Sequence, residues 1–127
     1  MASLQGKRVW ITGASRGIGA ALAEACSAAG AKCVLSARSQ DALQEVATAC
    51  GGAEVFELDL MNEEALEATA KQLLDAGPVD VMIHNAGLTQ RSLVKDTDMA
   101  VHRRIMQVNY FAPVALDRHV LGPMYER

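Results

Sequence analysis

Three glycines, Gly13, Gly17 and Gly19, lie close together in the segment TGASRGIG near the start of the chain. A short apolar run precedes them and apolar residues at helical spacing follow, so the segment joins an expected strand to an expected helix. The start of a helix offers unpaired N–H groups and the positive end of its dipole, and glycine lets an anion approach the backbone without meeting a Cβ atom. The spacing Gly-x-x-x-Gly-x-Gly therefore favours a loop that binds a pyrophosphate over a turn that merely connects strand to helix.

Pro113 lies inside a long segment, residues 97–121, whose pattern predicts a helix. Proline has no N–H group, so the carbonyl of Asn109 loses its helical partner and the helix is expected to kink there. That carbonyl is then free to hold another group. A kink that only curves the helix around its neighbours is the alternative.

Strand-like and helix-like segments alternate along the whole chain. Short apolar or β-branched runs predict buried strands at residues 8–12, 32–37, 54–58 and 80–84. Helical spacing of apolar residues predicts helices at residues 18–29, 43–50, 66–74 and 97–121. Strict alternation with short links implies right-handed crossovers, and hence a parallel sheet with helices on both faces. The expected fold class is therefore α/β.

Composition narrows the class of protein further. The 127 residues are enough for one domain or for part of a larger one, and half of them are apolar. With 12 Lys and Arg against 15 Asp and Glu, the net charge of -3 predicts no general attraction to nucleic acid or anionic lipid. The sequence has neither a signal-peptide pattern nor a run of about 18 apolar residues. We therefore expect a cytoplasmic protein with no membrane partner.

The three cysteines, Cys26, Cys33 and Cys50, lie within expected regular structure. They are odd in number and form no Cys-x-x-Cys pair, which argues against a disulfide framework or a metal site. We interpret them as small buried apolar residues.

Three motifs, in their order and spacing, carry a family resemblance that extends over the whole chain. TGASRGIG (residues 12–19), HNAG (84–87) and VNYFAP (108–113) resemble the short-chain dehydrogenase/reductases. QRSL (90–93) and the final PMYER are most similar to the branch that includes retinal and steroid type dehydrogenase/reductases. The resemblance implies a doubly wound Rossmann sheet and a nicotinamide dinucleotide cofactor.

The resemblance also assigns roles to individual residues. The first motif would hold the cofactor pyrophosphate, and the Asn-Ala-Gly motif would lie by the ribose and steady the central sheet. The residues implied are Thr12, Gly13, Ser15, Arg16, Gly17, Ile18, Gly19, Asn85, Ala86 and Gly87. His84 departs from the Asn usual at its place, and we expect it to be a structural residue at a strand end rather than a ligand.

Asp59 follows the third expected strand, and the resemblance implies that it contacts the adenine amino group, with the backbone of Leu60 beside it. A second role competes with this one. Asp59 precedes a helix that is expected to start near Asn62, and it could serve only to satisfy amide groups of the loop.

The residues after the second strand indicate which nicotinamide cofactor is used. A site that prefers NAD places a carboxylate there for the ribose 2′-OH, and that carboxylate would repel a 2′-phosphate. Here Arg38 and Ser39 stand instead, and Arg16 can approach from the glycine loop. A guanidinium gives a forked contact to phosphate, so the sequence predicts that NADP(H) is preferred over NAD(H). Solvated surface arginines are the alternative.

The residues that would perform hydride transfer are missing from the chain. The family uses a Tyr with a Lys four residues later and a Ser on the fifth strand, but Tyr110 is followed by Val114 and no Lys follows Lys95. In the family the Asn equivalent to Asn109 keeps its carbonyl open for a water that leads to the catalytic Lys. We therefore expect a single truncated domain, residues 1–127, with about four strands and four helices and without the C-terminal half.

The favoured function is the N-terminal, cofactor-binding portion of an NADP(H)-dependent oxidoreductase that acts on a small carbonyl or alcohol. We expect the chain alone to bind NADP(H) weakly and to show no turnover. Two alternatives remain: a non-catalytic nucleotide-binding module, and an interaction piece that pairs through the fourth helix with full-length subunits. The resemblance implies that full-length members form homo-oligomers.

Overall fold

The computed structural model describes residues 3–127, and these contain one parallel sheet with the strand order β3-β2-β1-β4. The strands are β1 (Arg8–Thr12), β2 (Lys32–Ser36), β3 (Glu54–Val55) and β4 (Val81–Ile83). The helices are α1 (Gly17–Ala28), α2 (Gln40–Ala49), α3 (Glu63–Asp75), the 3-10 turn η1 (Val94–Asp96), α4 (Met99–Met106), the π-helical segment η2 (Gln107–Phe111) and α5 (Ala112–Tyr125).

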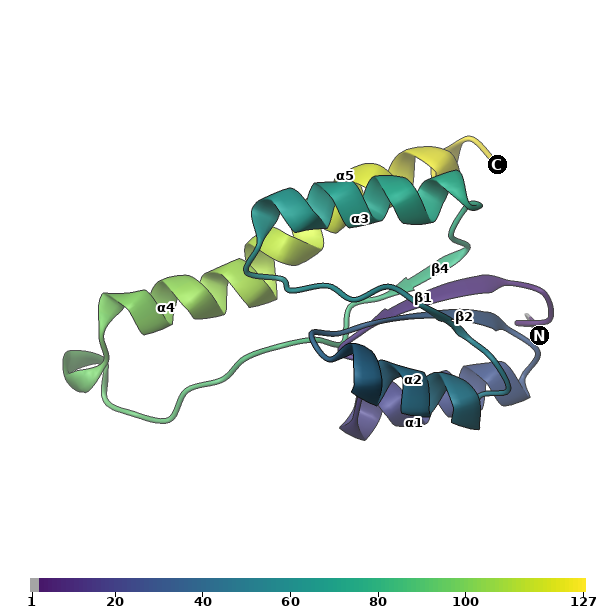
Figure 1. Cartoon of the computed structure of the whole chain (residues 1–127). Helices are drawn as coiled ribbons and strands as arrows, with labels where there is room; N and C mark the ends of the chain where they lie inside the picture. The colour runs from purple at the N-terminus through teal and green to yellow at the C-terminus, as the bar shows by residue number, and fades with distance from the viewer. Residues whose placement is uncertain (1–2) are drawn as a thin grey trace.

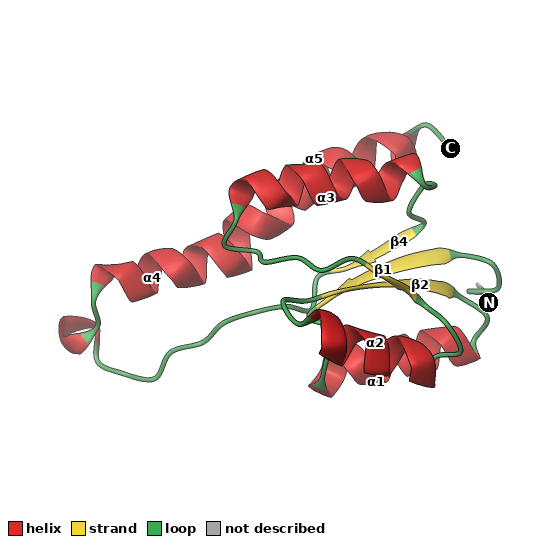
Figure 2. Cartoon of the chain, viewed as in Figure 1, coloured by secondary structure: helices red, strands yellow, loops and turns green. Residues whose placement is uncertain are grey.

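The helices cover both faces of the sheet, which confirms the expected half of a doubly wound α/β fold. Helices α1 and α2 lie against one face, and α3 and α5 lie against the other (Figure 1). The strands all point toward the side on which α4 projects beyond the sheet, and the C-terminus lies on the opposite side (Figure 2). Strand β4 lies at one edge of the sheet.

Alternation along β1 builds the two halves of the core. Val9 and Ile11 pack toward α1 and α2, whereas Trp10 packs toward α3 and α5, as the period of two in a strand requires. All three side chains are fully buried. The indole N–H of Trp10 donates to the hydroxyl oxygen of Ser36 at 2.9 Å, so the largest core side chain leaves no buried polar atom unpaired.

Strand β1 spans the expected residues 8–12, but the other three strands are shorter than the sequence pattern predicts, most clearly β3. Beyond its end, the N–H of Phe56 donates to the carbonyl of Leu35 and the N–H of Leu58 donates to that of Ala37, both at 2.9 Å. Backbone pairing therefore continues to Leu58, the expected end of the third strand, although the regular ladder stops earlier.

The expected fourth helix is interrupted where Pro113 predicts a kink. The π-helical segment η2 spans Asn109, and α4 and α5 continue the helix on either side. The expected end at Leu121 was wrong, because α5 runs through Pro123 to Tyr125. Pro123 stands in the last turn, where its missing N–H costs a single helical bond, and Met124 packs against the core.

The cysteine prediction is confirmed for two of the three residues. Cys26 and Cys33 are buried, and Cys50 is half-buried. Burial raises the pKa of both the Cys26 and the Cys33 thiol, which keeps them protonated at neutral pH. No group of three or more metal-binding side chains is found within residues 3–127. In the same range, no helix combines the length and the apolar character needed to cross a membrane.

A polar network closes the end of the sheet where the strands begin. The buried guanidinium of Arg8 donates to the carbonyls of Leu73 and Gly77 at the end of α3, and to Glu54 at 2.9 Å. The backbone N–H of Arg8 donates to Asp80 at 2.8 Å, and the Arg127 guanidinium reaches the same carboxylate at 2.7 Å. Arg8 thus joins β1, β3 and α3.

These donors predict an acid-sensitive contribution from Asp80. The N–H of Arg8 first, and then Arg127, hold the pKa of Asp80 below its ordinary value. A carboxyl whose pKa is lower in the folded state stabilises the fold at neutral pH, and that contribution is lost as the pH falls below about 4. We expect Asp80→Asn to lower the free energy of unfolding, measured in urea, more at about pH 6 than at about pH 3. If Asp80→Asn lowered the free energy of unfolding by the same amount at both pH values, the pH-dependent contribution assigned to Asp80 would be contradicted.

Candidate nucleotide-binding site

A pocket of about 650 Å³ opens where the strands end, between the glycine loop, the segments that follow β2, β3 and β4, and the α4–η2 helix. Its lining contains Thr12, Gly13, Ser15, Arg16, Gly17, Ile18, Ser36, Ala37, Arg38, Ser39, Ala42, Leu58, Asp59, Leu60, Met61, Asn85, Ala86, Gly87, Leu88, Arg104 and Val108. Every nucleotide-contacting residue expected from the sequence is among them except Gly19. Five separate segments thus converge on one concavity.

The three glycines of the loop have different structural roles. Gly13 has φ +65°, and a Cβ there would lie 2.9 Å from the Cα of Ala86. Gly17 has φ +57°, and the space that its Cβ would occupy is open. Gly19 is buried beneath the loop, where a Cβ would lie 2.1 Å from the carbonyl oxygen of Gly13. Gly17 therefore leaves room for a ligand, whereas Gly19 lets α1 pack closely against the loop.

Helix α1 begins at the pocket without a side-chain cap. Its N-cap residue, Arg16, makes no capping hydrogen bond, whereas Ser39 and Asn62 cap α2 and α3. The N–H of Ala20 donates to the carbonyl of Arg16, so the amides of residues 17–19 precede the helical ladder. Such amides, together with the helix dipole, fit a pyrophosphate.

Asn85 and Thr12 tie the glycine loop to the end of β4. The Asn85 side-chain amide donates to the carbonyl of Gly13 at 3.1 Å. The backbone N–H groups of Asn85 and Ala86 both donate to the Thr12 hydroxyl oxygen at 3.2 Å. These contacts fix the two expected cofactor-binding motifs relative to each other.

Three arginines line the pocket, and they include the expected Arg16 and Arg38. Arg16 and Arg38 both line it and are exposed, and neither forms any of the ion pairs within residues 3–127. Ser39 caps α2 by accepting from the N–H of Ala42 at 3.2 Å. Its hydroxyl hydrogen remains available to donate. The arrangement fits a phosphate group placed beside β2.

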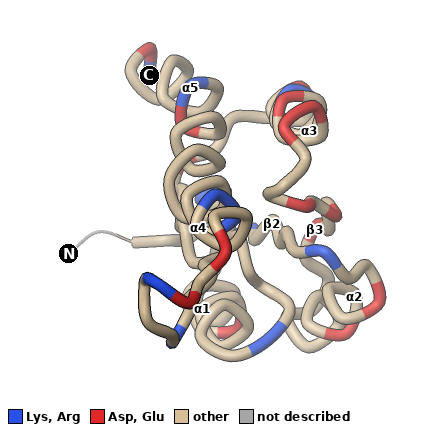
Figure 3. Tube along the Cα trace, turned by 90° about the vertical axis from the view of Figure 1, so that its left-hand side faces the viewer, with Lys and Arg blue, Asp and Glu red and all other residues tan. Residues whose placement is uncertain are grey.

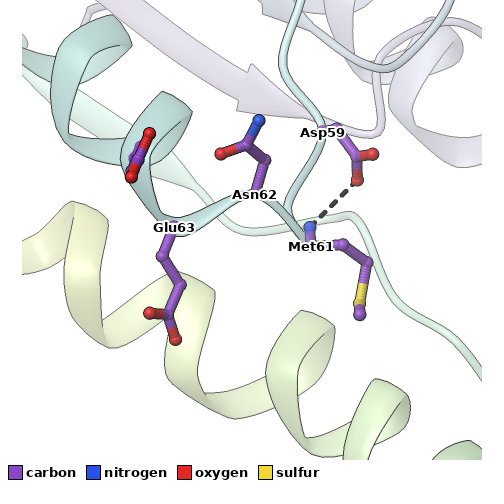
Figure 4. A pocket seen from close by; sticks show the side chains of 5 residues that line it. Asp59, Met61, Asn62 and Glu63 are labelled. Atoms are coloured by element: carbon purple, nitrogen blue, oxygen red, sulfur yellow. Dashed lines mark hydrogen bonds between the residues drawn. The ribbon is translucent and has the colours of Figure 1, made fainter.

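Asp59 makes the loop contact that was the competing role, and its contact with the adenine amino group stays a prediction. One carboxylate oxygen accepts from the N–H of Met61 at 2.9 Å, as Figure 4 shows, so Asp59 does satisfy a loop amide. The residue also lines the large pocket. A second hollow of about 600 Å³, drawn in Figure 4, lies on its other side and is lined by Met61, Asn62, Glu63 and Glu64 as well.

The π-helical segment holds two loops at the pocket wall. The Gln107 side chain donates to the carbonyl of Leu60 at 3.1 Å. The Asn109 side chain both accepts from the N–H of Leu88, at 2.8 Å, and donates to its carbonyl, at 2.7 Å. Asn109 is thereby committed through its side chain to the loop after Gly87, and its role in a proton relay stays a prediction.

His84 ties the end of β4 to α5. Its Nε2 lies 2.7 Å from a carboxylate oxygen of Asp117, and both side chains are partly exposed. This contact agrees with the expected structural role, because it holds α5 next to the strand that carries Asn85.

Sequence reasoning missed the contribution of α4 to the pocket. Arg104 and Val108 line it, four residues apart, and Leu88 and Met61 join them. The spacing of Arg104 and Val108 was visible in the sequence, but the direction in which that helix face points depends on how α4 meets the sheet.

Comparison with known proteins agrees with this geometry. The family model described as short chain dehydrogenase matches residues 7–127. Dehydrogenase/reductase SDR family member 7 of Homo sapiens is 40% identical over 128 residues, which cover 94% of this chain and 38% of that protein. The chain therefore spans less than half the length of this relative.

Solved structures show the same fold. A short-chain dehydrogenase from Streptomyces avermitilis has a TM-score of 0.91 at 36% identity, over 99% of this chain and 47% of that one. A metagenomic short-chain oxidoreductase in complex with NADP has a TM-score of 0.91 at 34% identity, over 97% of this chain and 58% of that one. The chain belongs to the short-chain dehydrogenase family of oxidoreductases, in the branch of the retinal and steroid type dehydrogenase/reductases.

Proposed function

We propose that the chain is the N-terminal, NADP(H)-binding portion of an oxidoreductase that interconverts a small carbonyl compound and an alcohol. When bound, the nicotinamide ring of this cofactor supplies or accepts a hydride. One observation carries the proposal: a single pocket gathers the uncapped start of α1, the Asn-Ala-Gly segment after β4, and Arg16 and Arg38, neither of which forms an ion pair among residues 3–127.

The chain's own residues would hold the dinucleotide in extended form along the carboxyl edge of the sheet. The amides of residues 17–19 would receive the pyrophosphate, and the open space at Gly17 admits it. Asn85 and Gly87 would line the ribose on the nicotinamide side. Ile18, which is 74% exposed at the pocket mouth, would gain apolar cover from the ring beyond it.

Arg16 and Arg38 support the choice of NADP(H) over NAD(H). Within the described residues 3–127 neither guanidinium group has a carboxylate partner, and a 2′-phosphate beside β2 would supply a negative charge to each. A carboxylate at this place would favour NAD(H) instead, but the residues after β2 are Ala37, Arg38 and Ser39.

Titration of the purified chain with NADPH and NADH, followed by nucleotide fluorescence, tests this function. We expect weak binding with NADPH preferred, and we expect Arg38→Asp to cost NADPH binding about 1 to 3 kcal/mol, a charged hydrogen bond's contribution. Lys95→Asp is the matched control, because it makes the same charge change in η1, outside the pocket lining. If Arg38→Asp weakened NADH binding as much as NADPH binding, this result would contradict the assignment of Arg38 to the 2′-phosphate.

We also propose that residues 1–127 form one truncated domain that does not turn over substrate by itself. No Tyr in the chain is followed four residues later by Lys, so the general acid of the family is lacking. In the complete protein, Asn109 would support the proton relay through its carbonyl. Oxidation of NADPH that depends on added carbonyl substrate, in the purified chain, would refute this.

An interaction role is the second candidate, and the exposed side of η2 and α5 favours it. Met106, Tyr110, Phe111 and Val114 are each 44–55% exposed. A contiguous apolar surface of this kind favours association with another subunit. Co-purification of tagged chain with a full-length family member would support this function, and titration with NADPH as above distinguishes it from cofactor binding.

A further inference from the structure

We propose that Arg104 contacts the adenine base of the dinucleotide, with its guanidinium packed over the exposed face of the ring. This inference rests on the proposed function and adds a base-recognising residue on α4 to the pocket. The basic positions of α4, Arg103 and Arg104, are blue in Figure 3, which views the molecule from the side on which α4 projects.

The wall of the pocket around Arg104 is apolar and suits a flat base better than a phosphate. Leu58 and Val108 are buried, Leu60 is half-buried and Met61 is exposed, and all four line the same pocket as Arg104. A purine has apolar faces and polar edges, so it gains most where aliphatic side chains cover a face and a polar group meets an edge. Asp59, on the same loop, supplies an acceptor for an edge amino group.

The position of α4 against this loop is fixed. The Gln107 side chain donates to the Leu60 carbonyl at 3.1 Å and joins the two walls of the slot. Arg104 lies one turn before Val108, and both line the pocket, so they share the face of the helix that looks across at Leu60 and Met61.

Arg104 is free to make this contact. It is exposed and takes part in none of the ion pairs within the described range 3–127. A guanidinium is planar and weakly hydrated, and it stacks on aromatic rings. The base would thus lie between aliphatic side chains on one side and the Arg104 plane on the other.

The neighbouring Arg103 offers a matched control. It is also exposed and lies on the same helix, but it is outside the pocket lining. Arg103→Ala and Arg104→Ala remove the same charge and place alanine in the same helix, so the two variants differ chiefly in the face of α4 that they change.

The experiment measures the Kd of the chain and of both variants for NADPH and for reduced nicotinamide mononucleotide, which lacks the adenosine half. We expect Arg104→Ala to weaken NADPH binding by about threefold to tenfold and to leave the Kd for the mononucleotide unchanged. We expect Arg103→Ala to change neither Kd. As a second measurement, the Nε–Hε resonance of Arg104 should shift in NMR spectra on addition of AMP but not of ribose 5-phosphate.

Three outcomes would overturn the proposal. Equal effects of the two variants would show that only net charge matters. If Arg104→Ala weakened binding of the mononucleotide as much as binding of NADPH, Arg104 would be a phosphate contact instead. A shift of the Arg104 resonance on addition of ribose 5-phosphate would lead to the same conclusion. Failure of the unmodified chain to bind NADPH would remove the proposed function together with this inference, whereas the first two outcomes leave that function standing.

Discussion

Gly19→Ala is expected to raise the Kd for NADPH by at least about tenfold and to lower the free energy of unfolding by about 1 to 3 kcal/mol. The added Cβ would lie 2.1 Å from the Gly13 carbonyl oxygen and 2.6 Å from the Asn85 side-chain nitrogen. The first of these atoms is backbone, so α1 or the glycine loop must move. Either movement displaces the amides that would receive the pyrophosphate.

Gly122→Ala is the control for this substitution. Gly122 lies in α5, and nothing lies within 4 Å of the position its Cβ would take. Alanine there should stabilise the chain by about 0.5 to 1 kcal/mol, because glycine loses more backbone entropy in a helix. Urea unfolding and NADPH titration of both variants check the prediction, which fails if Gly19→Ala unfolds and binds like the unmodified chain.

Arg8→Met is expected to cost about 2 to 4 kcal/mol of unfolding free energy, since it removes a buried guanidinium and leaves the Leu73 and Gly77 carbonyls without their donor. The ion pair with Glu54 adds less, because that carboxylate is 46% exposed. Methionine keeps most of the apolar stem, so lost packing contributes little.

The control is the exposed pair between Lys71 and Glu67 on α3, where both side chains are more than half exposed. Lys71→Met should hardly change the unfolding midpoint in urea, since a solvated pair on a helix surface gains little over hydration. A midpoint for Arg8→Met that equals that of Lys71→Met would show that the Arg8 network is dispensable.

Local sequence signals were enough to predict those parts of the structure that depend on residues close together in the sequence. The glycine loop, the buried strand β1 and the start of α3 at Asn62 follow from spacing and capping chemistry, whereas α2 begins at Gln40, three residues before the expected start, with Ser39 as its cap. The convergence of the glycine loop with Asn85 also follows, because the carboxyl ends of parallel strands meet at one edge of the sheet.

Features that depend on distant contacts were missed or only half predicted. Pro113 indicated an interruption near Asn109, but the sequence did not show that it takes π-helical form, with Gln107 and Asn109 bonded to two different loops. The approach of Arg104 to the loop after β3 likewise depends on the placement of α4. The spacing marked Gly19 as a ligand contact but did not show that its missing Cβ serves the packing of α1 against the Gly13 carbonyl.

The π-helical segment Gln107–Phe111 also constrains how this protein can vary. A residue in an α-helix turns about 100° from its predecessor, and a π turn accommodates one residue more than an α turn. The segment thus sets the rotational phase between Arg104 and Val108, at the pocket, and Leu116 and Val120, in the core. A regular α-helix over the same number of residues would swing one of these faces about 100° off target, whereas deleting one residue here would restore α-helical geometry with both faces still in place.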